Sequence, residues 1–143
     1  MCDATQTLRE ARALAGLAQT LVAWCDARID AGDLPLPPRE WTVRENRWLA
    51  GRYGVDARLI VEDPDGGKPQ RRPIPELVEE LVAELAETAS VLGTRAELDD
   101  VARIATDGSG TNRQRQLIDA GGTLLDVVHF LVDELASEPP AAT

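Results

Sequence analysis

The stretch TLREARALAGLAQTLVAWCDARIDAG, residues 7–32, predicts one long helix and favours a mainly helical fold. Thr7 is a suitable N-cap, and Glu10 three residues later completes a capping box. Apolar residues then recur at helical spacing to about Asp30, and Gly32 supplies the left-handed residue on which helices commonly end. We therefore expect a helix from Leu8 to about Asp30.

This first helix is apolar on nearly all sides. At about 100° per residue, Leu17 and Trp24 lie opposite a second apolar face. That second face carries Leu8, Ala11, Ala15, Ala18, Val22, Cys25 and Ile29. A helix of this kind is stable when it is buried on more than one side. The sequence thus predicts a further covering layer, either another part of a larger protein or a second copy.

Breaking residues divide the rest of the chain into shorter elements. Residues 34–38, LPLPP, form an extended connector, and residues 63–67, DPDGG, form a turn between two strands. The expected elements are a helix at 39–53 ending at Gly54, strands at 57–62 and 68–72, and helices at 74–92, 95–105, 111–120 and 124–135. The fold class is therefore mainly α with one short β-hairpin. We expect residues 1–136 to form a single helical domain or a fragment of a larger one, and residues 137–143 to form a disordered tail.

The net charge of −10 is unevenly distributed. Residues 76–143 carry 4 basic and 14 acidic groups, whereas residues 35–75 carry 8 basic and 6 acidic groups. Nucleic acids and anionic membranes bind clustered positive charge, so the composition argues against both as partners. Only the middle segment can attract a phosphate or a carboxylate.

Cysteine usage and hydropathy indicate a cytoplasmic protein. Cys2 and Cys25 show no metal-ligand spacing, and reduced thiols are the simpler account of them. No run approaches the roughly 18 apolar residues of a membrane span. A secretory signal is not expected either, because Asp3 and Glu10 stand where positive charge is required.

The middle segment contains RENRW at residues 44–48, preceded by Trp41 and followed by Arg52. Helical spacing places Trp41, Arg44, Glu45, Trp48 and Arg52 on one face. Guanidinium groups bind carboxylate and phosphate oxygens in a bidentate manner, so this face is a candidate anion site. The alternative is structural: the two tryptophans would pack into the core while the arginines flank them.

RENRW at 44–48, followed by RYGVDA at 52–57, resembles the C-terminal part of the carboxylate–amine ligases, the type 2 glutamate–cysteine ligase family. The resemblance extends from Met1 to about Leu135 and implies part of a glutamine-synthetase-like α+β ligase. It implies a reaction in which ATP and magnesium activate a carboxyl group as an acyl phosphate, which an amine then attacks. The positions that match the family are Asp3 as a substrate-binding residue and Arg44, Asn46, Arg47, Trp48 and Arg52 as cofactor-binding residues.

The same resemblance implies that the metal-binding strands of the catalytic sheet lie upstream of this sequence. Only Met1-Cys2-Asp3 matches the end of a strand of that sheet. We therefore expect the C-terminal part of a ligase, incomplete as an isolated chain, whose partner is the missing N-terminal catalytic half or another copy. The alternative is a non-catalytic, acidic helical module that binds a partner protein or forms a homo-oligomer.

Other motifs have simple structural interpretations. Residues 65–68, DGGK, lack the spacing of a phosphate-binding loop and indicate a hairpin turn. Residues 108–111, GSGT, indicate a linker and helix cap, with a helix N-terminal anion site as the alternative. Arg113 and Arg115 are expected in solvent, and His129 is expected to pair with nearby aspartates. With one histidine and no paired cysteines, the sequence predicts no protein-side metal site.

Overall fold

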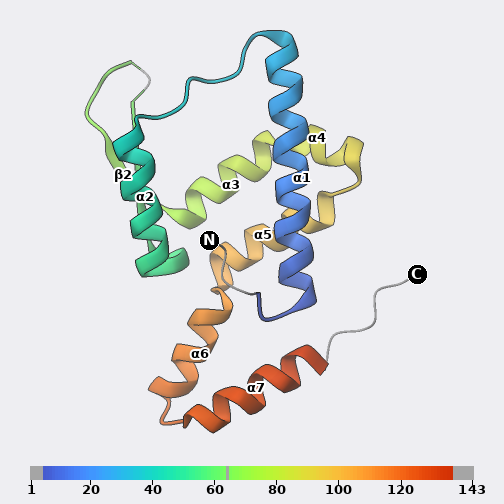
Figure 1. Ribbon diagram of the computed structural model, residues 1–143, viewed down its shortest axis with the longest axis vertical. Helices are drawn as coiled ribbons and strands as arrows, with labels where there is room; N and C mark the ends of the chain where they lie inside the picture. Colours follow the sequence, from blue (N-terminus) through green and yellow to red (C-terminus); the bar gives the residue numbers. More distant parts are fainter. Residues whose placement is uncertain (1–4, 64, 137–143) are drawn as a thin grey trace.

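The computed structural model describes residues 5–63 and 65–136 and confirms a mainly helical fold with one β-hairpin (Figure 1). In chain order the elements are α1 (Leu8–Ala31), α2 (Glu40–Tyr53), the 3₁₀ turn η1 (Gly54–Asp56), β1 (Arg58–Val61), β2 (Gln70–Pro73), α3 (Ile74–Glu84), α4 (Ala86–Leu92), α5 (Arg95–Asp107), α6 (Gly110–Asp119) and α7 (Leu124–Ala136). None of the helices in the described part of the chain is long and apolar enough to cross a membrane. The expected tail at 137–143 lies outside the described residues.

The ends of α1 follow from local hydrogen bonding. The Thr7 hydroxyl accepts a hydrogen bond from the Glu10 backbone N–H, as an N-cap does. The Glu10 carboxylate accepts from the backbone N–H of Gln6, one residue before the cap, so the return bond of the capping box is displaced by one position. Gly32 ends the helix with a φ of 73°, a conformation that glycine adopts without a steric penalty.

The core lies where α1 crosses in front of α4 and α5 (Figure 1). Leu85, Ala89 and Leu98 are fully buried there. They are packed by residues of α1 and α3, namely Leu17, Leu21, Trp24, Leu81 and Val82. Gly16 allows α1 to approach α5 closely, because a Cβ atom at that position would stand 2.5 Å from the Cβ of Glu97.

A pair of buried hydroxyl groups joins α1 to the residue before α5. Thr20 and Thr94 are both buried, and their Oγ1 atoms are 2.6 Å apart. The Thr20 hydroxyl donates to the Gly16 carbonyl oxygen at 2.7 Å. Because a hydroxyl has one proton, Thr94 must donate to Thr20.

The prediction of one continuous helix over residues 74–92 is wrong in one respect, because the structure divides that helix at Leu85 into α3 and α4. Leu85 has a ψ of −4°, well away from the helical value, although its N–H still bonds to the Leu81 carbonyl. The bend places the fully buried Leu85 side chain in the core while α4 turns beneath α1. The sequence has no glycine or proline at the bend, so its cause is tertiary packing.

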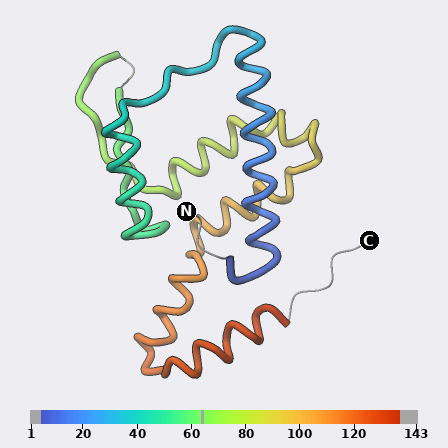
Figure 2. Tube along the Cα trace, viewed as in Figure 1, coloured from blue at the N-terminus to red at the C-terminus, as the bar shows by residue number. Residues whose placement is uncertain are grey.

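α2 and the hairpin form a lateral unit, which the connector after Gly32 joins to α1 (Figure 2). The strands are antiparallel, with Arg58 opposite Pro73 and Val61 opposite Gln70. Gly66 has a φ of 82° in the connecting turn, and its N–H bonds to the Asp63 carbonyl at 3.0 Å, as expected of a turn. At the other end of the molecule, α6 and α7 form a pair (Figure 2), and Asn112 near the start of α6 donates a hydrogen bond to Asp56 of η1.

Candidate functional site

The outer side of α2 carries the residues that we call the arginine–tryptophan face: Trp41, Arg44, Trp48 and Arg52. All four side chains are exposed, and the exposed fractions of Trp41 and Trp48 are 42% and 57%. The two tryptophans therefore do not pack into the core, as the structural alternative required. Glu45 is half-buried at the edge of the face, 3.9 Å from the Arg71 guanidinium.

The inner side of α2 is fixed to the hairpin. The Thr42 hydroxyl donates to the Glu62 carboxylate, and Leu49 is buried. Asn46 holds β1 through two hydrogen bonds: its amide nitrogen donates to the Ile60 carbonyl at 2.8 Å, and its amide oxygen accepts from the Ile60 N–H at 2.7 Å. The Asn46 amide thus acts as a neighbouring strand would, and it determines how α2 is oriented.

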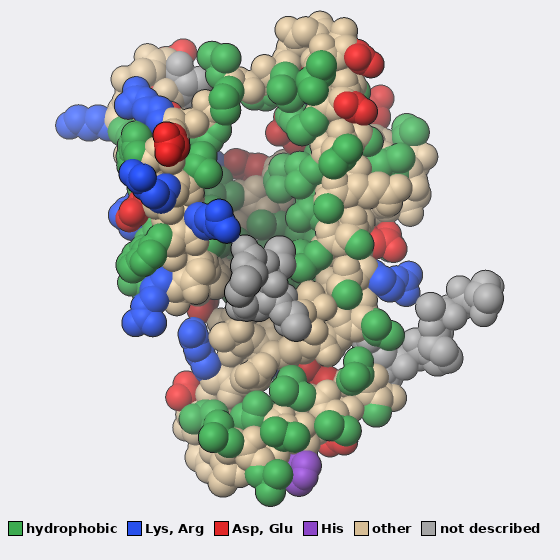
Figure 3. Space-filling view, viewed as in Figure 1, with side chains coloured by type: hydrophobic (Ala, Val, Ile, Leu, Met, Phe, Trp, Pro, Cys, Tyr) green, Lys and Arg blue, Asp and Glu red, His purple; other side chains and the backbone are tan. Residues whose placement is uncertain are grey.

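The arginines of this region divide into paired and unpaired groups. Arg72 lies 2.6 Å from Glu80, and Arg39 lies 3.8 Å from Glu62. Within the described residues, by contrast, Arg44, Arg47 and Arg52 form no ion pair or hydrogen bond from their side chains. Lys and Arg side chains gather over α2 and the hairpin on the side shown in Figure 3. An unpaired guanidinium group can bind an anion without first breaking a protein contact.

The structure brings together most of the residues that the sequence singled out. Arg44, Trp48 and Arg52 lie on one stripe, while helical spacing places Arg47 on the flank of the same helix. Trp48 is also in edge-to-face contact with Tyr53, with ring centroids 6.1 Å apart and an interplanar angle of 83°. Asp3, the other candidate, lies outside the described residues.

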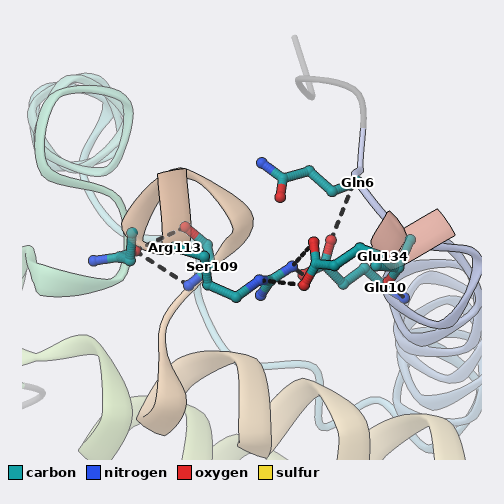
Figure 4. Close-up of polar contacts among 7 residues, drawn as sticks. Gln6, Glu10, Ser109, Arg113 and Glu134 are labelled. Carbon is teal, nitrogen blue, oxygen red and sulfur yellow. Dashed lines mark hydrogen bonds and ion pairs between the residues drawn. The ribbon is translucent and has the colours of Figure 1, made fainter. Parts of the chain in front are cut away.

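Sequence reasoning missed a cluster of charges at Arg113 (Figure 4). Arg113 was expected in solvent, but it reaches from α6 to two carboxylates: its Nη2 is 2.8 Å from Glu10 of α1, and its Nε is 2.8 Å from Glu134 of α7. The Nε contact is close without the alignment of a hydrogen bond, whereas Nη2 donates to both partners. Burial alone would lower the pKa of Arg113, but the hydrogen bonds that Arg113 donates to Glu10 and Glu134, together with the negative charges of these carboxylates, outweigh burial and raise that pKa.

The remaining motifs have structural roles. Ser109 and Asn112 form the capping box of α6, which confirms a helix cap at 108–111. The Asn112 amide also donates to Asp56 at 2.9 Å, in a cleft of about 410 Å³ between η1, α5 and α6. Hydrogen bonds from the backbone and the side chain of Thr123 lower the pKa of Asp126, and the charge of exposed His129 on the same helix adds a smaller contribution. In the described part of the chain, no three His, Cys, Asp or Glu residues are grouped as metal ligands would be.

The comparison with known families identifies the class of this chain. The sequence model of glutamate–cysteine ligase family 2 matches residues 1–134, which include the whole arginine–tryptophan face. The chain belongs to this family.

The chain is similar to several longer bacterial proteins that are named glutamate–cysteine ligase 2. It is 40% identical to one from Frankia casuarinae over 141 residues, which are 98% of this chain and 36% of that protein. It is 39% identical to one from Thermobifida fusca, with 99% of this chain and 34% of that protein covered. The chain thus spans about a third of the length of the relatives that it matches.

Proposed function

We propose that this chain is the C-terminal segment of an ATP-dependent carboxylate–amine ligase, and that its arginine–tryptophan face contributes to the site for the anionic reactants. The observation that carries the proposal is that Arg44 and Arg52 are exposed and have no side-chain partner among the described residues, and that exposed Trp48 lies beside them. All three stand on a helix whose opposite side is fixed to the hairpin. Family membership supports the proposal, because a glutamate–cysteine ligase acts on carboxylate groups, and one that uses ATP would also bind phosphate groups.

The residues of α2 fit a nucleotide or carboxylate ligand. Each guanidinium group offers donors in a fork that matches two oxygen atoms of a phosphate or carboxylate. An exposed indole ring offers a flat apolar surface for an aromatic base or a substrate side chain. Because Asn46 and Thr42 fix the inner side of α2, the arginines are presented on a rigid element.

The proposed reaction has two balanced steps. A glutamate γ-carboxylate oxygen attacks the γ-phosphorus of ATP, which forms an acyl phosphate and releases ADP. The amine of cysteine then attacks the acyl carbon, the C–N bond forms as phosphate leaves, and the amine loses its proton to solvent or to a base. Arginines that contact the transferring phosphoryl group would stabilise charge that increases in the transition state.

We propose that carboxylates outside the described residues hold the magnesium. Bound magnesium would neutralise phosphate charge during the transfer. Carboxylates are its usual protein ligands, yet the described residues contain no cluster of three such groups. The isolated chain is therefore expected to show no ligase activity, and the assay requires the rest of a family member.

The test is a chimera in which this chain replaces the matching segment of the Thermobifida fusca relative. We expect ATP- and magnesium-dependent coupling of glutamate to cysteine, measured as ADP release and as dipeptide. Replacing cysteine by hydroxylamine should yield the γ-hydroxamate, because hydroxylamine intercepts an acyl phosphate. A folded chimera without either product would contradict the proposed function.

Two arginine variants test the site within an active chimera. Arg44→Met and Arg52→Met should each lower kcat/KM by roughly 10-fold to 100-fold, the range for removing a hydrogen bond to a charged group. Arg115→Met is the matched control, because Arg115 is an exposed arginine on α6, away from α2. If all three variants lost activity equally, the arginine–tryptophan face would have no special role.

A non-catalytic helical module remains the second candidate, and exposed apolar residues favour it. Leu124, Leu125, Val128, Val132 and Leu135 are all exposed along α7. Such a stripe is typical of a surface that meets another protein or a second copy. A stable homo-oligomer of the isolated chain together with an inactive chimera would support this candidate.

A further inference from the structure

α1 has two apolar sides, and the described part of the chain covers only one of them. The inner side carries the buried Ala13, Gly16 and Thr20 and the partly buried Leu17 and Trp24, which pack on α4 and α5. We call the opposite side the outer stripe of α1; it consists of Ala11, Ala15, Ala18, Val22 and Ile29. At about 100° per residue the centres of the two sets are roughly 170° apart, so one surface cannot cover both.

The outer stripe has the composition of a buried surface. All five of its residues are exposed, with Val22 at 67% and Ile29 at 59%. β-branched residues are poor choices for an exposed helix position, because their side chains are restricted there and gain no burial. The stripe contains no charge, although Arg12, Gln19 and Asp26 stand directly beside it.

The three alanines of the outer stripe indicate that a partner can approach α1 closely. Ala11, Ala15 and Ala18 lie on successive turns, so the backbone of α1 is accessible along this line. A helix or strand can approach such a surface closely, as α5 approaches α1 at Gly16 on the inner side. Large side chains at these positions would have kept a partner at a greater distance.

The position of the stripe relates it to the arginine–tryptophan face. α1 and α2 both stand in the front layer of Figure 1, and α5 lies behind α1. The outer stripe is opposite α5. It therefore faces the front of the molecule, where α2 also lies. Figure 3 shows hydrophobic side chains along α1 on this side and basic side chains over α2. A protein segment bound to the outer stripe of α1 would therefore lie next to the arginines of α2.

The length of the relatives indicates which protein segment would cover the outer stripe. The relatives are about three times the length of this chain, so about two-thirds of each lies outside the matched segment. We propose that the outer stripe of α1 is the docking surface for that remaining part of the ligase fold. This inference rests on the proposed function, since it places the missing catalytic part against α1 and beside the arginines of α2.

The first test compares the isolated chain with the Thermobifida fusca chimera. In the isolated chain, Val22→Arg and Ala15→Arg change exposed positions and should leave the Tm unchanged. In the chimera each should lower the Tm by roughly 5 °C or more, because the introduced charge would be buried at an apolar contact. Gln19→Arg is the control; it is the same change on the polar side of the same helix and should have little effect in either protein.

A second measurement detects coverage without introducing a charge. Ala18→Cys, with Cys2 and Cys25 replaced by serine, should react quickly with a thiol reagent in the isolated chain. In the chimera the reaction should be at least about tenfold slower, because a covered thiol reacts only when the contact opens. Glu87→Cys on the exposed side of α4 should react at similar rates in both proteins.

The outcomes separate this inference from the proposed function. An active chimera in which Val22→Arg behaves like Gln19→Arg, or in which the cysteine at position 18 stays fully reactive, would overturn the docking surface and leave the function standing. A folded but inactive chimera in which the stripe is protected would support the docking surface and contradict the function. The isolated chain could instead form a dimer that Val22→Arg converts to a monomer. That result would mean that the outer stripe binds a second copy of the chain.

Discussion

The contact between α1 and α5 and the contact of α7 with its neighbours show two different ways of joining helices. α1 and α5 meet through close packing at Gly16, the fully buried Leu98 and a bonded pair of hydroxyls. α7 buries Val127 but leaves five large apolar side chains exposed, and a charge cluster at Arg113 connects it to α1. The first contact is complete within this chain, whereas the second leaves apolar surface for another body.

Leu98→Ala should have the largest effect, because it opens a cavity in the completed contact. Truncation of a fully buried leucine costs about 2–5 kcal/mol of unfolding free energy. Urea unfolding followed by circular dichroism measures the loss. Leu125→Ala on α7 is the matched control; its side chain is exposed, so its cost should stay within about 0.5 kcal/mol. Equal costs would mean that the surface of α7 is buried in solution.

Arg113→Met should have an intermediate and local effect. It leaves Glu10 and Glu134 facing each other without their shared cation, at a cost of about 1–3 kcal/mol for partly buried groups. Hydrogen exchange should become faster in α6 and α7, while the amides of α5 around Leu98 keep their protection.

Arg115→Met is the control: it removes a positive charge from α6 but leaves the contacts of Arg113 intact. Arg115 is the exposed arginine two residues further along the same helix. Its exchange pattern should match that of the unmodified chain. If Arg113→Met accelerated exchange throughout the molecule, the two contacts would not be energetically distinct.

The smallest effect should be the loss of unfolding free energy when acid protonates Asp100, at the edge of the α1–α5 contact. A hydrogen bond from Arg9, with the charges of Arg9, Arg103 and Arg12, lowers the pKa of Asp100 against the opposing effect of burial. A lowered pKa gives stability that is present above the unfolded-state value of about 3.9 and is lost as the pH falls through the folded-state value. Because Arg9 is largely exposed, the contribution is at most about 1 kcal/mol.

The measurement for Asp100 is the urea midpoint of the unmodified chain and of Asp100→Asn between about pH 6 and pH 2.5. The difference between the two proteins should be present at pH 6 and should shrink below about pH 4 as Asp100 is protonated. A difference that stays constant across this range would assign the effect of the substitution to packing.

Most of the fold could be predicted from local signals. Thr7 and Gly32 define the ends of α1, and the DPDGG turn with its flanking strands defines the hairpin. The bend at Leu85 could not be predicted, because the sequence there continues a regular amphipathic helix. The bend depends on how α3 and α4 pack around the core, which is information from outside the segment.

The candidate site could be predicted in part, for the same physical reason. Helical periodicity places Arg44, Trp48 and Arg52 on one face, and the structure confirms that this face is exposed. Periodicity could not show that Asn46 is bonded to the Ile60 backbone or that Arg113 meets Glu10. Both contacts join residues of different elements, so they follow from the tertiary arrangement and not from spacing along one helix.

The direction of the hydrogen bond from Thr94 to Thr20 constrains which substitutions these two positions can accept during evolution. Because the only proton of Thr20 goes to Gly16, position 94 must supply a donor for as long as position 20 keeps its hydroxyl. Valine at position 94 alone would leave a buried oxygen without that partner, and a later change at position 20 would relieve the cost. The two positions, 74 residues apart in sequence, should therefore be inherited as a pair, and an alignment of descendants should show them changing together.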